Sequence, residues 1–124
     1  MSEAKTILLV DDDVTLREMY DERLKAEGYV ITQASNGEEA LKLAKETKPQ
    51  IILLDIMMPK VNGFDVLKTL KADPALKDIP VIILSALIQD VDRIEGKKLG
   101  AVDYIVKSET MPGEVIEKIN NAVK

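Results

Sequence analysis

The composition of this 124-residue chain limits the chemistry that it can perform. It holds 17 basic and 22 acidic residues, for a formal net charge of −5, and it has neither histidine nor cysteine. Without imidazole or thiol groups it can form no Ser-His-Asp or Cys-His catalytic site, no ordinary structural zinc site and no disulfide framework. Carboxylates, hydroxyls, amines and an oxygen-preferring metal such as magnesium remain available.

Length and hydropathy predict one domain, residues 1–124, with a mostly aliphatic core. The longest apolar runs, such as Ile51 to Leu54, are far shorter than the roughly 20 residues that cross a bilayer. The absence of cysteine suits a reducing compartment and no leader sequence precedes Lys5, so we expect a cytoplasmic protein that binds no membrane. Its basic residues are scattered, which predicts no direct contact with nucleic acid.

Short apolar runs predict five strands. Four runs are continuously apolar, which is typical of strands buried on both faces: residues 7–10, 51–54, 81–84 and 104–106. A fifth, residues 29–34, is more mixed, as expected of an edge strand. The approximate starts, at residues 7, 29, 51, 81 and 103, are separated by 22, 22, 30 and 22 residues. Each interval therefore has room for one helix and two short loops.

Helical periodicity fills the intervals and the C-terminal segment. The first helix carries one apolar stripe, made of Leu16, Met19, Tyr20 and Leu24, and should end at Gly28 in a left-handed cap. Turn residues bound the other helices: the second opens at Asn36 and ends at Pro49, and the third follows Gly63 and closes at Asp73-Pro74. The fourth, marked by Val91, Ile94 and Leu99, ends before Gly100, and the fifth follows Pro112-Gly113. Alternating strands and helices predict an α/β fold with a parallel sheet between helical layers.

Polar side chains follow four of the predicted strands. Asp11, Asp12 and Asp13 come after the first, and Asp55, Ser85 and Lys107 after the third, fourth and fifth. Alone, each has an ordinary structural explanation as a helix cap, a turn residue or a surface lysine. Because ligands of parallel sheets bind at the carboxyl ends of the strands, however, we expect these side chains to share one edge of the sheet.

Such a group of residues suits phosphoryl transfer. Carboxylates brought together repel one another, and magnesium, held by carboxylates, waters and phosphate oxygens, relieves the repulsion. A metal ion and an ammonium neutralise charge on the phosphoryl oxygens, a hydroxyl adds a hydrogen bond, and an aspartate is the nucleophile.

The sequence resembles the receiver domain of two-component response regulators over essentially its whole length. The resemblance rests on five places: Leu9-Val10-Asp11-Asp12-Asp13, Leu54-Asp55-Ile56-Met57-Met58-Pro59, Gly63, Leu84-Ser85-Ala86, and Tyr104-Ile105-Val106-Lys107. It implies a doubly wound, flavodoxin-like sandwich of five parallel strands in the order 2-1-3-4-5 with five helices.

The resemblance also implies a role for each matching residue. Asp55 would accept the phosphoryl group and be the modified residue, assisted by Lys107 and Ser85. Magnesium would be bound by Asp12 directly, by Asp11 largely through water, by Asp55 and by the backbone carbonyl of Met57. Ser85 and Tyr104 would form the switch, whereas Asp13 matches no metal position and is expected to cap a helix.

A phosphohistidine on a sensor histidine kinase or phosphotransfer protein is the donor that the resemblance implies, with small acyl phosphates as substitutes. Phosphorylation would change the surface of the fourth helix, fifth strand and fifth helix, where Ile88, Val91 and Tyr104 are candidates for contact with a downstream effector. The protein would be a monomer or a phosphorylation-dependent dimer. It would catalyse only its own phosphorylation and dephosphorylation, and its effector would be a separate protein unless the chain is a fragment of a longer regulator.

The sequence departs from the family next to the predicted site: Ser108 follows Lys107 where relatives usually have proline. Rival interpretations fit less well. An aspartate-nucleophile phosphatase of the haloacid dehalogenase type carries its two aspartates after the first strand, and a flavin binder needs a phosphate loop where this chain has three carboxylates. A pseudo-receiver, a constitutive interaction module that is never phosphorylated, stays as the alternative.

Overall fold

Five strands and five helices alternate along the chain, as predicted. The computed structural model describes residues 5–56, 63–85, 90–106 and 112–122. The strands are β1 (Lys5–Val10), β2 (Tyr29–Ala34), β3 (Ile51–Asp55), β4 (Val81–Ser85) and β5 (Asp103–Val106). The helices are α1 (Val14–Ala26), α2 (Gly37–Thr47), α3 (Gly63–Ala72), α4 (Asp90–Lys98) and α5 (Pro112–Ala122). Among the helices described, none has the length and apolarity needed to cross a membrane.

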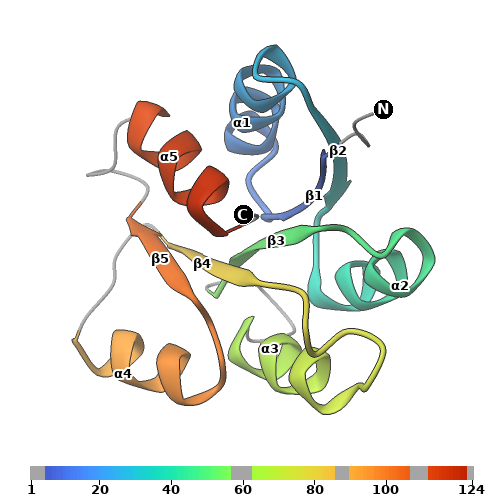
Figure 1. The fold of residues 1–124 in the computed structure, drawn as a ribbon, viewed down its shortest axis with the longest axis vertical. Coiled ribbons are helices and arrows are strands. Elements are labelled where there is room, and N and C mark those ends of the chain that lie inside the picture. The colour runs from blue at the N-terminus through green and yellow to red at the C-terminus, as the bar shows by residue number, and fades with distance from the viewer. Residues whose placement is uncertain (1–4, 57–62, 86–89, 107–111, 123–124) are drawn as a thin grey trace.

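The strands form one parallel sheet in the order β2-β1-β3-β4-β5, which confirms the expected doubly wound topology. Figure 1 shows α1 and α5 on one face of the sheet and α2, α3 and α4 on the other. The edge strands are β2, as its mixed sequence predicted, and β5. In a parallel sheet all strands end at the same edge, and the polar residues named above follow the strands at that edge.

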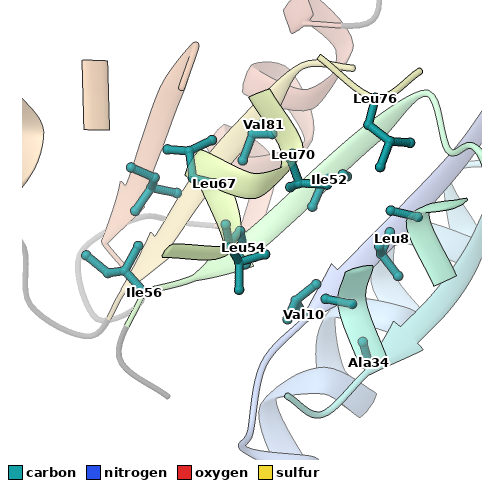
Figure 2. Packing of buried hydrophobic residues seen from close by; sticks show 14 residues of the cluster. Leu8, Val10, Ala34, Ile52, Leu54, Ile56, Leu67, Leu70, Leu76 and Val81 are labelled. Atoms are coloured by element: carbon teal, nitrogen blue, oxygen red, sulfur yellow. The ribbon is translucent and has the colours of Figure 1, made fainter. Parts of the chain in front are cut away.

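The core has two halves because successive side chains of a strand point to opposite faces of the sheet. On the face of α2 and α3, Leu8 and Val10 pack with Ile52 and Leu54, as Figure 2 shows. On the face of α1 and α5, their strand neighbours Ile7, Leu9, Ile51 and Leu53 form the second cluster. The central strands are therefore buried on both sides, as their continuous apolar sequences predicted.

The turn residues begin or end the helices for the expected physical reasons. Gly28, two residues after α1, has φ +93°, a left-handed conformation that glycine adopts without a steric penalty. Asn36 caps α2 by accepting a hydrogen bond from the amide of Glu39 at 2.9 Å. Lys48, just before Pro49, ends the same helix with φ 44°.

Helical periodicity misplaced some apolar side chains. Met19 is 49% exposed, because α5 covers α1 only in part and leaves Met19 lining a groove with Val115 and Ile116. Ile94 is 59% exposed. Helix α4 approaches the sheet instead at Gly96, where an added Cβ would lie 2.3 Å from the Cδ1 atom of Ile83. The fifth helix also begins at Pro112 rather than after Gly113.

Candidate functional site

The sheet brings the predicted aspartates and serine to its carboxyl edge. Asp11 directly follows β1, and Asp55 and Ser85 are the last residues of β3 and β4. Val10 pairs with Leu54, so that Asp11 and Asp55 are neighbours across two adjacent strands. The expectation that the residues after the strands share one edge of the sheet agrees with the structure for Asp11, Asp55 and Ser85.

Three carboxylates form a cluster at this edge. Asp11, Asp12 and Asp55 each offer one oxygen, and these oxygens all lie within 4.8 Å of one another. Asp11 is fully buried, Asp55 is 2% exposed and Asp12 is exposed, so the cluster opens to solvent through Asp12. The donors are all carboxylate oxygens, the ligand type that magnesium prefers. The residues present therefore fit the metal that the sequence predicted.

Hydrogen bonds fix the turn that carries Asp11. Its amide donates to the carbonyl of Ala34 at 3.1 Å, and its Oδ1 accepts from the amide of Asp13 at 2.9 Å. Its carbonyl accepts from Nη1 of Arg17 at 2.7 Å, and Nε of Arg17 donates to Oε1 of Gln33 at 3.1 Å. The turn is thus held from α1 and β2 at once, and the carboxylate of Asp11 is oriented before any ligand binds.

Asp13 has the structural role that the sequence assigned to it. Its side chain accepts a hydrogen bond from the amide of Leu16 at 3.1 Å and caps α1. Of three consecutive aspartates, two therefore belong to the carboxylate cluster, and the third accepts a hydrogen bond from an amide in the first turn of a helix.

Gly63 lies against the backbone that carries Asp55. Its amide donates to the carbonyl of Ile56 at 3.2 Å. A Cβ on Gly63 would lie 2.4 Å from the carbonyl oxygen of Asp55 and 2.4 Å from Cα of Ile56. A residue without a side chain is therefore required where α3 begins beneath the end of β3.

Ser85 and Tyr104 share one face of the sheet. Ile83 pairs with Tyr104 and Ser85 pairs with Val106. Because side chains alternate along a strand, Ser85 points to the same face as Ile83, which is also the face where Tyr104 packs. Ser85 is fully buried and Tyr104 is half-buried.

Some predicted residues lie outside the described part of the chain. These are Met57, Lys107 and Ser108, together with Ile88 and the side chain of Val91. Val106, which immediately precedes Lys107, pairs with Ser85 at the end of the sheet.

The contribution of Arg17 and Gln33 was missed by the sequence analysis. Their contact joins a helix to an edge strand 16 positions away in the chain. Neither residue stands at a strand end, and no spacing rule links them to Asp11. Only the packing of α1 against β2 shows that they support the carboxylate cluster.

Comparison with known proteins identifies a family. The model of the family described as "Response regulator receiver domain" matches residues 7–120. The chain is 38% identical over 123 residues to the "Probable transcriptional regulator ycf27" of Porphyra purpurea, covering 99% of this chain and 49% of that protein. It is 37% identical over 120 residues to the "Phosphate regulon transcriptional regulatory protein PhoB" of Pseudomonas aeruginosa, covering 97% of this chain and 52% of that protein. The chain thus spans about half the length of these curated relatives.

Solved structures share the whole fold. The chemotaxis protein CheY4 of Vibrio cholerae superposes with a TM-score of 0.91 at 28% identity, covering 97% of this chain and 99% of that one. A putative response regulator from Chloroflexus aurantiacus has a TM-score of 0.91 at 31% identity, covering 98% of both chains. The similarity therefore extends over the sheet, the helices and the edge that holds the carboxylates.

Proposed function

The chain belongs to the family of response regulator receiver domains, and we propose that it is a phosphorylation-dependent switch whose phosphoryl acceptor is Asp55. One observation carries the assignment of the acceptor. Asp55 is almost completely buried at the end of β3, and its carboxylate lies within 4.8 Å of those of Asp11 and Asp12. The proposed domain comprises residues 1–124.

In the proposed reaction an oxygen of the Asp55 carboxylate attacks phosphorus. A new bond between phosphorus and that oxygen forms as the bond between phosphorus and the imidazole nitrogen of a donor phosphohistidine breaks, and the imidazole leaves. This chain has no histidine, so the proposed donor is a phosphohistidine outside it, on a sensor histidine kinase or a histidine phosphotransfer protein. With a small acyl phosphate, the bond that breaks joins phosphorus to the leaving carboxylate oxygen.

Asp11, Asp12 and Asp55 would hold Mg²⁺ in this site, and the carbonyl of Met57 is a fourth proposed ligand. The ion would neutralise negative charge that develops on the phosphoryl oxygens. The protein supplies the orientation: Arg17 and the amide of Asp13 hold Asp11 in place, so the site needs little rearrangement during the reaction. Lys107 is proposed as the cationic partner of the phosphoryl group.

Output would come from a change in the surface of α4, β5 and α5. We propose that Ser85 moves toward the phosphoryl group and that Tyr104 turns into the space it leaves, which is supported by their common face of the sheet. This is a two-state element biased by a local charge. The curated relatives are named as transcriptional regulators, which supports a downstream effector as the partner of that surface. The proposed location is the cytoplasm, and the proposed state is a monomer or a phosphorylation-dependent dimer.

Phosphorylation by a small acyl phosphate tests the acceptor directly. Incubation with acetyl phosphate and Mg²⁺ should add the mass of one phosphoryl group to the wild type and nothing to Asp55→Asn, as measured by intact-mass spectrometry. Mg²⁺-dependent binding of beryllofluoride, a phosphoryl mimic, should be lost in the same variant. Asp65→Asn, which changes an exposed carboxylate on α3, is the control and should behave as the wild type.

If wild type and Asp55→Asn are modified equally, Asp55 is not the acceptor. If neither is modified and neither binds beryllofluoride, the pseudo-receiver alternative replaces the switch.

A further inference from the structure

A cation from α5 lies over the ring of Tyr104. Nζ of Lys118 is 5.6 Å from the ring centroid, within the roughly 6 Å at which an ammonium is attracted to the face of an aromatic ring. The same Nζ donates to both carboxylate oxygens of Asp103, at 3.0 and 3.1 Å. Asp103 therefore holds the ammonium beside the ring of the next residue in β5.

Tyr104 and Lys118 come from opposite faces of the sheet. Tyr104 packs with the core half that contains Ile83, whereas α5 packs into the other half through Val115 and Ile119. Because β5 is an edge strand, Lys118 reaches Tyr104 around the open edge of the sheet. The ring of Tyr104 accordingly lies toward that edge.

We propose that Lys118 is a positioning residue that stabilises the edge-side orientation of Tyr104 and thereby opposes the phosphorylation-dependent switch. The inference rests on the proposed function, in which Tyr104 turns into space left by Ser85. A ring that turns toward Ser85 moves away from the ammonium and loses the attraction. Lys118 therefore stabilises the unphosphorylated state relative to the phosphorylated one.

The size of the effect follows from the exposure of the contact. The side chains of Lys118 and Asp103 are 31% and 34% exposed, so solvent weakens the attraction. A cation over an aromatic ring at such a site changes an equilibrium about two- to fivefold. A phosphoryl mimic binds the switched state, so its apparent affinity scales with the population of that state. Removal of the Lys118 cation should therefore raise the apparent affinity by the same factor.

The orientation of the ring can be measured without phosphorylation. In protein with ¹³C-labelled tyrosine, the ring signals of Tyr104, assigned with Tyr104→Phe, should shift in Lys118→Met. Methionine keeps most of the aliphatic stem and removes the charge. Lys118→Arg should retain the wild-type signals, because a guanidinium also stacks on aromatic faces. Lys42→Met, which removes an exposed lysine of α2, is the charge-matched control and should leave them unchanged. Unchanged Tyr104 signals in Lys118→Met would show that Lys118 does not position the ring.

Beryllofluoride binding with Mg²⁺ tests the effect on the switch. Lys118→Met should bind about two- to fivefold more tightly than the wild type, and Lys118→Arg and Lys42→Met as the wild type does. In a Tyr104→Leu background, Lys118→Met should have no effect, which separates the ring contact from the general loss of a positive charge. Equal or weaker binding by Lys118→Met, or the same gain without Tyr104, overturns the proposal.

The two proposals fail in different ways. If the wild type shows no Asp55-dependent beryllofluoride binding, the phosphorylation switch falls, and the opposing role of Lys118 falls with it. If that binding is present but Lys118→Met does not strengthen it, only the role of Lys118 is wrong. The ring signals report the contact itself in both cases.

Discussion

At Gly63 the addition of a single methyl group should disturb the site. The atoms that an added Cβ would meet belong to the backbone of Asp55 and Ile56, and backbone cannot rotate away as a flexible side chain can. Gly63→Ala must therefore displace either the end of β3 or the start of α3. Overpacking of this kind costs about 1–3 kcal/mol, so urea unfolding should show a loss of stability of that size. Beryllofluoride binding should weaken too, because Asp55 moves with its backbone.

Gly113 provides the matched control for Gly63. It also lies in the first turn of a helix, but an added Cβ there would meet nothing within 4 Å. Gly113→Ala should raise the free energy of unfolding by about 0.4–1 kcal/mol, because alanine restricts the unfolded chain without strain in the helix. If both alanine variants have the same stability, the close approach of Gly63 to β3 is not what constrains that position.

Lys71, near the end of α3, connects that helix to the segment before β4 and to the turn before β5. Its Nζ donates to the carbonyls of Lys77 at 2.9 Å and Ile79 at 3.0 Å, between α3 and β4. Its aliphatic stem passes Gly100 in the turn before β5, where an added Cβ would lie 3.2 Å from Cε of Lys71. This lysine therefore anchors the segment that leads into β4.

Lys71→Met should lower the free energy of unfolding at neutral pH by about 1–3 kcal/mol, because it keeps the stem and leaves two carbonyls without their charged donor. Urea unfolding measures the loss, and Lys68→Met, an exposed lysine on the same helix, should cost far less. Equal losses in the two variants would mean that the carbonyl contacts contribute nothing.

The pH dependence of Lys71 has a definite sign. Burial lowers the pKa of Lys71, against a smaller opposing effect of Asp78. At alkaline pH values below 10.5, the ordinary pKa of a lysine ammonium, Lys71 therefore holds its proton more firmly in the unfolded chain than in the folded protein. The stability advantage of the wild type over Lys71→Met should accordingly grow as pH rises through that window.

Elements were easier to predict than the contacts between them. Continuous apolar runs specify strands buried on both faces, and Gly28 and Asn36 end or begin helices for local reasons, so these features were predictable from sequence. Met19 was predicted to face the core, but a period of 3.6 residues does not reveal how far a neighbouring helix extends. The contacts of Lys71 depend on how α3 meets the turn at Gly100, which no local pattern encodes.

For the molecule as a whole, the carboxylate cluster was predictable because the topology of the sheet brings its members together. Once the strands are parallel, their carboxyl ends share one edge, and the residues that follow them meet. The cluster of Asp11, Asp12 and Asp55 confirms that argument. The supporting contact of Arg17 with Gln33 joins distant elements through long side chains, and only the folded structure shows it.

Because three carboxylates are grouped at the proposed magnesium site, the stability of the whole fold should depend on magnesium. Their mutual repulsion should destabilise the folded protein when no cation is bound and should disappear in the unfolded chain, where the three side chains separate. A cation that binds only the folded state stabilises it by about 2.7 kcal/mol at 100 times its dissociation constant. For a domain of this size that corresponds to a rise in Tm of about 10 °C. Thermal unfolding in excess Mg²⁺ and in EDTA should show this difference for the wild type.

Asp12→Asn tests the repulsion among the carboxylates separately from the binding of Mg²⁺. Asp12 is the exposed member of the cluster, so its replacement disturbs no buried packing. In EDTA the variant should unfold at a higher temperature than the wild type, because one of the three negative charges is gone, and its Tm should respond only weakly to Mg²⁺. Glu46→Gln, an exposed change on α2, should leave both properties as in the wild type. A variant that is less stable than the wild type in EDTA would show that the cluster does not strain the fold, and one that gains as much stability from Mg²⁺ would show that Asp12 does not hold the cation.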